Sequence, residues 1–341
     1  MSTIERAWGD AGPIASGIRA LLAPFGWLYG SIGRARNYAY DVGWLDVHAS
    51  KLPVLSVGNL AVGGTGKTPI SAYFVQRLLA AGAHPGVVLR GYGGDEPLVH
   101  QQLNPGTLVV VDADRVRGVS RAHAEGCDVA VLDDAFQHRR IARAVDCVLV
   151  SAEQSPNVPR YLPAGPWREQ YGALARASLV LVTRKSASVE RAAAVAEMLS
   201  GYSSRVGVAA LPVDTVRTLG VPGERPMIAM RDARILAIAG IGNPQSFAEQ
   251  LRAAGWRVEL RTYGDHHAYT ERDVAQLSAA ARSFDAVVTT LKDAVKLTPL
   301  WPRTGPPLWY VSQRVVLESG TEFVDASIEQ ILRLRHQNQT I

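Results

Sequence analysis

Short runs of Val, Ile and Leu alternate along most of the chain with longer, Ala-rich segments in which apolar residues recur at helical spacing. The runs predict strands that are buried on both faces, and the Ala-rich segments predict helices. The expected strands are Leu52–Val57, Val87–Leu89, Leu108–Val111, Val129–Leu132, Cys147–Val150 and Leu179–Val182, and the expected helices include Ile70–Ala81 and Val189–Leu199. The alternation indicates a parallel sheet with helices on both faces.

A weaker stretch from Val206 to Met230 mixes short apolar segments with Pro and Gly, after which the alternation resumes. The later elements are expected at Ile235–Ala239, Phe247–Ala254, Ala286–Thr289 and Ser327–His336, as strand, helix, strand and helix. With 341 residues, the chain exceeds the usual size of one domain. We therefore expect a larger α/β domain over residues 1–210, a linker over 211–230, and a smaller α/β domain over 231–341 that includes the C-terminal helix.

The N-terminal segment carries apolar and aromatic residues at helical spacing between Ile14 and Tyr29. Arg19 and Pro24 interrupt this run, which makes it a poor membrane-spanning helix. An amphipathic helix with Arg beside its aromatic side chains can lie in the headgroup layer of a membrane. Packing of the same helix on the rest of the protein explains the pattern equally well.

The charge balance is basic, with 36 Lys and Arg residues against 31 Asp and Glu residues. A nucleotide, a nucleic acid or an acidic membrane would each suit this balance. Because no basic run with interleaved aromatic residues occurs, we expect no nucleic-acid partner. Cys127 and Cys147 lie in apolar runs, and no secretory signal precedes them, so we expect buried, reduced thiols in a cytoplasmic protein.

A glycine-rich segment follows the first predicted strand and precedes the first predicted helix. Such a loop offers backbone N–H groups to phosphate oxygens, while its lysine reaches the β- and γ-phosphates and its threonine binds Mg²⁺. The residues expected to do so are Gly63, Gly64, Thr65, Gly66, Lys67 and Thr68. The usual motif G-x-x-x-x-G-K-[ST] has glycine at the position of Ala61, so the match is incomplete. The segment nevertheless predicts a phosphate-binding P-loop.

Two adjacent carboxylates, Asp133 and Asp134, follow the apolar run Val129–Leu132. Because neighbouring carboxylates repel each other, a bound cation is a physical reason for the pair, and P-loop enzymes use such an acid for their metal. A solvated strand end is the alternative. Arg139 and Arg140 come shortly afterwards, and either of them could clamp a phosphate.

Together, several segments resemble the ordered motifs of the tetraacyldisaccharide 4′-kinase family. They are Ser56–Pro69, Arg90–Pro97, Asp133–Arg140, Leu162–Glu169, Gly240–Pro244, Asp265–His267 and Thr289–Leu297. The P-loop of that family also lacks its first glycine. The resemblance extends from about Leu52 to Leu297, which is most of the chain.

The resemblance implies a P-loop NTPase-like parallel sheet domain with a second, smaller α/β domain. It implies transfer of the γ-phosphate of ATP, with Mg²⁺, to the 4′-hydroxyl of an acylated glucosamine disaccharide 1-phosphate, a step of lipid A biosynthesis. It also implies peripheral attachment to the cytoplasmic face of the inner membrane of a Gram-negative bacterium.

The family's site residues carry over to matching positions of this sequence. Asp95 matches the catalytic aspartate, His266 the histidine that assists it, and Lys67 the phosphate-binding lysine. Further matches at the nucleotide and the metal are Tyr92, Arg115, Gln137, His138 and Arg168, with Thr68, Asp133, Asp134 and Glu169 as the expected metal ligands.

Two positions depart from the family pattern. The segment that members usually insert before Asp95 is missing, and Leu291 replaces an acidic residue. His267 is an alternative partner for Asp95. Two rival functions remain open, namely a nucleotide-switch ATPase or GTPase and a soluble kinase of a small metabolite. No spacing indicates the acyl-chain preference, the nucleotide preference or the oligomeric state.

Overall fold

The computed structural model describes residues 8, 12–91, 94–219, 223–242 and 244–339, and the chain forms two compact units. The larger unit comprises residues 1–91, 103–211 and 315–341, and the smaller unit comprises residues 92–102 and 212–314. The chain therefore leaves the larger unit twice and returns to it twice.

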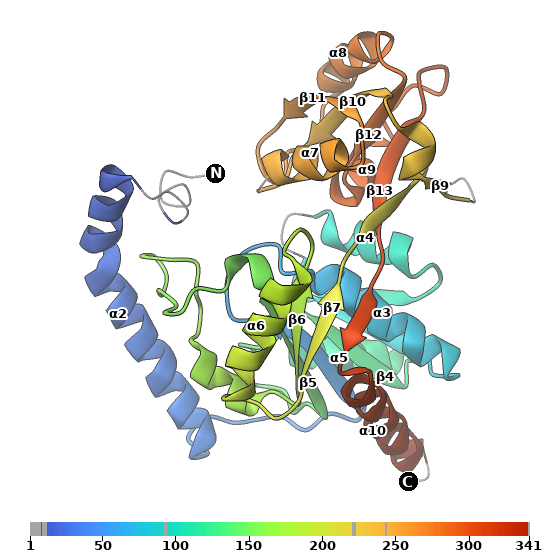
Figure 1. Ribbon diagram of the computed structural model, residues 1–341. Coiled ribbons are helices and arrows are strands. Elements are labelled where there is room, and N and C mark those ends of the chain that lie inside the picture. Colours follow the sequence, from blue (N-terminus) through green and yellow to red (C-terminus); the bar gives the residue numbers. More distant parts are fainter. Residues whose placement is uncertain (1–7, 9–11, 92–93, 220–222, 243, 340–341) are drawn as a thin grey trace. The chain divides into compact units, whose positions relative to one another are not determined.

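A sheet of eight strands forms the centre of the larger unit (Figure 1). Its strands are β1 (Val54–Asn59), β2 (Pro85–Leu89), β3 (Leu108–Val111), β4 (Val129–Asp133), β5 (Val145–Ser151), β6 (Leu179–Arg184), β7 (Val206–Ala210) and β14 (Val316–Ser319). They lie in the order β14-β7-β6-β5-β1-β4-β2-β3, and all named pairs are parallel except that of β14 with β7. The strands expected from the sequence are present, with ends that shift by two residues or fewer.

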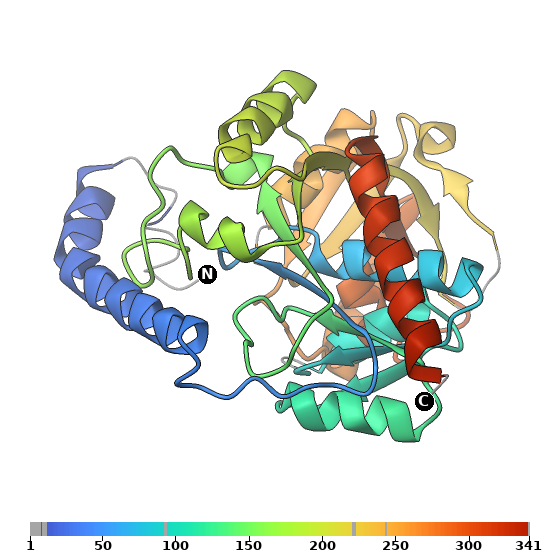
Figure 2. The same ribbon diagram turned by 90° about the horizontal axis from the view of Figure 1, so that it is seen from below.

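Helices cover both faces of this sheet. They are α3 (Lys67–Ala80), α5 (Arg115–Ala124), α6 (Val189–Ser200) and α10 (Thr321–Gln339), with short 3-10 helices η1 (Ala152–Gln154) and η2 (Tyr171–Arg176). On one face, Phe74 of α3 and Ile328 of α10 share a core with Val131 of β4. On the other face, Leu132 packs with Val119 of α5, and α6 contributes a further core. Figure 2 shows α10, in red, passing beside α3. Successive residues of β4 thus enter opposite cores, as a strand buried on both faces requires.

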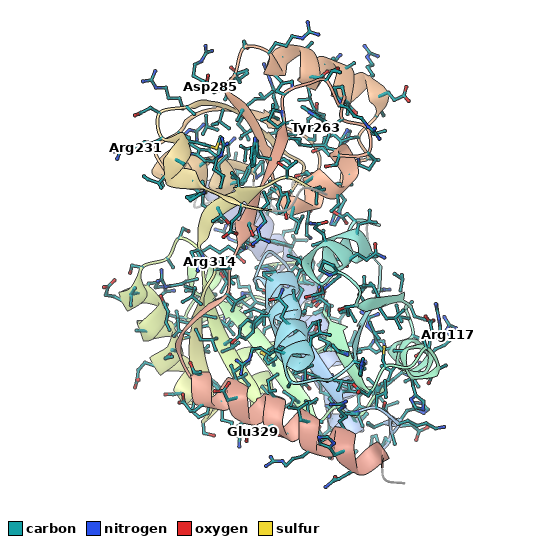
Figure 3. The ribbon with its side chains drawn as sticks, turned by 90° about the vertical axis from the view of Figure 1, so that its right-hand side faces the viewer. Arg117, Arg231, Tyr263, Asp285, Arg314 and Glu329 are labelled. Atoms are coloured by element: carbon teal, nitrogen blue, oxygen red, sulfur yellow. The ribbon has the colours of Figure 1, made fainter. Side chains whose placement is uncertain are left out.

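The C-terminal helix α10 was expected in the smaller domain, and the structure corrects this. Strand β14 joins the edge of the larger sheet, and Ile331 of α10 is buried in the core beneath it. Arg335 of α10 forms an ion pair with Asp128 at 2.6 Å. Figure 3 labels Arg314, where the chain leaves the smaller unit, and Glu329 on α10. An amphipathic pattern shows that one helix face is buried but not which unit covers it.

The smaller unit has a six-stranded sheet of its own. Its elements are α4 (Glu96–Leu103), β8 (Val213–Arg217), β9 (Arg225–Pro226), η3 (Met227–Met230), β10 (Arg234–Ala239), α7 (Pro244–Ala253), β11 (Arg257–Thr262), α8 (Glu271–Ala281), β12 (Ala286–Thr289), α9 (Leu291–Leu297) and β13 (Leu308–Gln313). The order is β11-β10-β12-β13-β8-β9, in which the first four strands are parallel and β8 and β9 are antiparallel to their neighbours.

Two further boundaries differ from the expectation. The expected linker over 211–230 contains β8, β9 and η3, and Met227 lies in the core of the smaller unit with Trp256. Residues 92–102, expected in the larger domain, belong to the smaller unit. In both cases the partners lie far away in sequence. Strand β8, for example, pairs with β13, so local periodicity cannot reveal its place.

The N-terminal helix α2 (Pro13–Asp41) belongs to the larger unit and continues through Pro24. It packs closely on the loop that carries Tyr161, because a Cβ at Gly30 would lie only 2.3 Å from the Tyr161 ring. Its exposed apolar side chains are Ile14, Leu21, Phe25, Trp27, Leu28, Tyr29, Ile32 and Tyr38, followed beyond the helix by Val42, Trp44, Leu45 and Val47. Among the described residues, no helix combines the length and the apolar character needed to cross a membrane.

The two cysteines behave as expected. Cys127 and Cys147 are buried and do not form a disulfide. Burial raises the pKa of the Cys147 thiol, so it remains protonated at neutral pH.

Candidate active site

The glycine-rich loop lies between β1 and the first residue of α3, Lys67. Gly66 precedes the helix with φ +87°, a conformation that favours glycine, and a Cβ there would lie 2.3 Å from Leu211 Cδ1, so that side chain would have to move. Gly63, at φ +129°, also adopts a conformation that favours glycine. The loop therefore has the backbone freedom and close approach that a phosphate site needs.

Polar side chains from neighbouring strands hold the loop in place. Asn59 Nδ2 donates to Thr65 Oγ1 at 2.9 Å, and Thr183 Oγ1 donates to the Thr65 carbonyl at 2.8 Å. Lys185 Nζ donates to the Gly64 carbonyl at 2.7 Å. Thr183 and Lys185 lie at and after the end of β6 and were not among the expected site residues. The sequence could have indicated them, because polar residues directly after a buried strand lie at the ligand-binding edge of a parallel sheet.

Asp133 and Asp134 lie beside this loop, because Val57 of β1 is the register partner of Asp133 on β4. Asp133 is buried and accepts a hydrogen bond from Ser71 Oγ at 3.2 Å. Asp134 adopts φ +52°, a strained value for a residue with a side chain, and its Oδ2 lies 3.9 Å from Lys67 Nζ. The structure thus brings the expected lysine and both expected acids together.

Arg168 and Gln137 join Lys67, Asp133 and Asp134 in one group of charged and polar side chains, the phosphate cluster. Arg168 donates to both oxygens of Asp134, at 2.9 and 3.3 Å, and to Gln137 Oε1 at 3.3 Å. Gln137 Nε2 donates to Glu169 Oε1 at 3.1 Å, and the other oxygen of Glu169 accepts from Asn37 of α2 and from Arg176. Glu169 was expected as a metal ligand. The donors around its two oxygens link it to α2 and to Gln137, and its role as a metal ligand stays a prediction.

Arg115 and His138 also lie in the larger unit near Asp133. Arg115 is buried and donates to the backbone carbonyls of Asp112 at 2.8 Å and Asp133 at 3.4 Å. Burial, followed by the charge of Arg115, lowers the pKa of His138, so the imidazole is neutral at pH 7. Tyr92 lies outside the described residues.

The two arginines considered for phosphate binding have other partners. Arg139 forms an ion pair with Asp41 of α2 at 2.7 Å, and Arg140 lies 3.4 Å from Asp114. Both contacts tie the end of the sheet to neighbouring elements. We therefore assign no phosphate contact to either arginine.

The expected Mg²⁺ ligands can be judged by the chemistry of their donor atoms. Thr68 is the second residue of α3, Asp133 is the last residue of the adjacent strand β4, and Asp134 follows it, so all three residues, which carry one hydroxyl and two carboxylates, lie at the carboxyl-end edge of the sheet. Mg²⁺ prefers such oxygen donors and needs few of them from the protein when phosphate oxygens and water supply the rest. These three residues fit Mg²⁺. Within the described part of the chain, no cluster of three or more His, Cys, Asp or Glu side chains is placed to hold a metal alone.

The second cluster lies entirely within the smaller unit. Asp95, just before α4, is buried, and His266 Nδ1 lies 3.0 Å from its Oδ1. His266 has φ +56°, and its backbone N–H donates to the Gly240 carbonyl at 3.2 Å. A strained backbone at a histidine that faces a buried carboxylate is typical of a functional site. Asp95 and His266 were expected in different domains, and the structure corrects this as well.

His267 has a different environment from His266. Its Nε2 lies 3.2 Å from Asp273 Oδ2, and the centre of its ring lies 4.7 Å from the centre of the Tyr263 ring. Tyr263 is labelled in Figure 3. The pairing of Asp95 is therefore with His266 in this structure.

The larger unit belongs to the P-loop NTPase-like class of nucleotide-binding folds, because its central parallel strand leads through a glycine-rich loop into a helix that begins at lysine, beside a strand that ends in acids. A family model described as Tetraacyldisaccharide-1-P 4′-kinase matches residues 18–333, and the chain belongs to this family.

Individual members of this family are similar to the chain over most of its length. The chain is 34% identical over 346 residues to the tetraacyldisaccharide 4′-kinase of Stenotrophomonas maltophilia, a match that covers 96% of each chain. It is 36% identical over 316 residues to that of Syntrophotalea carbinolica, which covers 85% of this chain and 86% of the relative. Among solved structures, LpxK from Aquifex aeolicus in complex with ATP matches with a TM-score of 0.73 at 25% identity, over 93% of this chain and 99% of that one. The family and the fold class expected from the sequence are confirmed.

Proposed function

We propose that the protein is an ATP-dependent kinase that transfers the γ-phosphate to the 4′-hydroxyl of a tetraacyldisaccharide 1-phosphate, a precursor of lipid A. Family membership supports the reaction, and the pair formed by Asp95 and His266 at 3.0 Å is the observation that favours a hydroxyl acceptor over water. A nucleotide switch has no need of a base beside an acceptor hydroxyl.

The phosphate cluster would hold the triphosphate. The loop from Gly63 to Gly66 offers its backbone N–H groups, and Lys67, held 3.9 Å from Asp134, would reach the β- and γ-phosphates. Mg²⁺ bound by Thr68, Asp133 and Asp134 would neutralise charge on the phosphate oxygens. Arg168, which is 26% exposed and paired with Asp134, is available to contact phosphate as the charge on the transferring group develops.

Asp95 is the proposed base. As the 4′-hydroxyl oxygen forms its bond to the γ-phosphorus, the bond from that phosphorus to the bridging oxygen of ADP breaks, and the hydroxyl proton passes to the Asp95 carboxylate. His266 orients this carboxylate through the contact to Oδ1. ADP leaves with the electron pair of the broken bond.

The exposed apolar side of α2 supports peripheral attachment to the cytoplasmic face of the inner membrane. Phe25 and Trp27 are 60% and 69% exposed, while Gly26 and Gly30 face the loop at Tyr161. A helix with one packed side and exposed aromatic side chains can insert shallowly into the headgroup layer. This location suits an acceptor whose acyl chains lie in a bilayer.

The proposal can be tested with the full chain, ATP labelled in its γ-phosphate, and the acylated disaccharide 1-phosphate in detergent micelles. Thin-layer chromatography should show a labelled lipid, and an acceptor lacking the 4′-hydroxyl should give none. Release of labelled phosphate at the same rate with and without lipid would favour the switch protein instead. Labelling of a water-soluble metabolite in place of the lipid would favour the soluble kinase.

A further inference from the structure

Lys296 of α9 lies in the same cluster as Asp95, and it has no part in the base mechanism of Asp95 and His266. Its Nζ lies 3.8 Å from Asp95 Oδ2 and 3.5 Å from Asp293 Oδ1. The same Nζ is buried and lies 5.5 Å from the centre of the Tyr269 ring. One buried cation is therefore shared between two buried carboxylates and an aromatic face.

The two carboxylates have unequal support. Asp293, fully buried, accepts hydrogen bonds from the Gly240 N–H at 3.0 Å, from Tyr269 Oη at 3.1 Å and from Thr290 Oγ1 at 2.8 Å. Burial and the charge of Asp293 raise the pKa of Tyr269, so its hydroxyl stays protonated and remains a donor. These three hydrogen bonds stabilise the buried Asp293 carboxylate without a contribution from Lys296.

Among the described residues, fewer groups are placed to balance the charge of Asp95. Its side chain is 1% exposed, with His266 facing Oδ1 and Lys296 facing Oδ2. Asp265 lies 4.0 Å from His266 Nε2 and adds negative charge on the far side of the imidazole. Since a buried carboxylate is costly unless paired, the ammonium of Lys296 supplies a positive charge beside Asp95 that does not depend on the protonation of His266.

We propose that Lys296 is a positioning residue for phosphoryl transfer: its ammonium holds Asp95 as an ionised, oriented carboxylate between itself and His266. The inference rests on the proposed role of Asp95 as the base. A carboxylate that is already ionised, with an imidazole at one oxygen and a cation near the other, can accept the hydroxyl proton without first losing one of its own. Lys296 itself touches neither substrate nor the reacting atoms in this role.

The first experiment compares Lys296→Met with Lys296→Arg and with Arg282→Met, an exposed cation at the end of α8 in the same unit. Lys296→Met should lower kcat at pH 7 by about 10- to 100-fold, with little change in the KM for ATP. The acidic limb of its pH–kcat profile should move up by about one to three pH units, because an opposite charge next to the base has been removed. Lys296→Arg should recover part of kcat and the original limb, and Arg282→Met should match the unchanged protein. An unmoved acidic limb in Lys296→Met would overturn the proposal.

A second variant distinguishes an effect of Lys296 on Asp95 from an effect of Lys296 on Asp293. It also avoids leaving an unbalanced buried charge that could destabilise the fold. Lys296→Met combined with Asp293→Asn removes one charge of each sign from the buried cluster, so the fold should be retained. If Lys296 acts on Asp95, the double variant stays slow and keeps the shifted limb. Recovery of normal turnover and of the original profile would show that Lys296 only balances Asp293, and would overturn the proposal.

The base itself is tested separately with Asp95→Ala. In that background, Lys296→Met should cause no further loss of turnover, since the group on which Lys296 acts is gone. A further 10-fold loss would overturn the role assigned to Lys296 while leaving the base in place. Near-normal turnover of Asp95→Ala alone would instead contradict the proposed function of Asp95.

Discussion

Replacing Glu153 with Gln should loosen the loop after β6 and weaken nucleotide binding. Glu153 Oε1 accepts hydrogen bonds from the backbone N–H groups of Lys185, Ser186 and Ala187, at 2.6, 2.9 and 3.1 Å. Ser151 Oγ donates to the other oxygen at 2.7 Å. Partial burial would raise the pKa of Glu153, but the hydrogen bonds from Ser151 and the loop outweigh it and lower the pKa from 4.5 to about 2.

The size of the effect follows from this shift. One pKa unit corresponds to about 1.4 kcal/mol, so a fall from 4.5 to about 2 gives an upper limit of about 3.4 kcal/mol in the free energy of unfolding. Although the Glu153 carboxylate is partly buried by the loop, much of the residue is exposed to solvent, and screening reduces the expected contribution to about 1–2 kcal/mol. Because the folded pKa lies below the unfolded one, the stabilisation is present above pH 4.5 and is lost as the pH falls toward 2.

Urea unfolding of the unchanged protein and of Glu153→Gln measures this difference. At pH 7 the variant should be less stable by about 1–2 kcal/mol, and the difference should shrink as the pH is lowered below 4.5. The KM for ATP should rise by about two- to fivefold, because Lys185, which donates to the Gly64 carbonyl of the P-loop, is less well held. Glu197→Gln, an exposed change on α6, is the matched control. A stability difference that stays constant with pH would refute the reasoning.

In a folded Lys67→Ala variant, steady-state assays should show turnover reduced by about 10²-fold or more, because charge at the transferring phosphoryl group is lost; near-normal turnover would contradict its phosphate role. Asp95→Ala and His266→Ala should each reduce turnover by about 10²-fold with smaller effects on ATP affinity, and the double variant should be little slower than the slower single one. Multiplicative losses in that double variant would show that the two groups act separately. Replacing exposed Phe25 and Trp27 with Ser should shift the protein from the vesicle fraction to the soluble fraction in flotation, and unchanged flotation would place the anchor elsewhere.

The sequence by itself determined the elements whose signals are local. The short apolar runs predicted strands such as β3 and β12 to the residue, because runs of four residues rich in Val between turn or helix signals are typical of strands. The glycine-rich loop was predicted because Gly66 and Lys67 occupy adjacent positions between a strand and a helix. Asp133 could be placed near that loop in advance, since carboxyl ends of parallel strands share one edge of a sheet.

Only the tertiary structure decided which distant segments meet. Asp95 and His266 are 171 residues apart, and no periodicity relates them, so their place in one unit became visible only in the fold. The same holds for the return of α10 to the larger unit and for the donors that surround Glu169. A local pattern indicates which face of an element is buried. It does not indicate which other segment covers that face, and the composition of a site depends on that segment. Lys296 illustrates the difference: its sequence position gives a lysine on a short helix, and only the fold places its ammonium between two carboxylates.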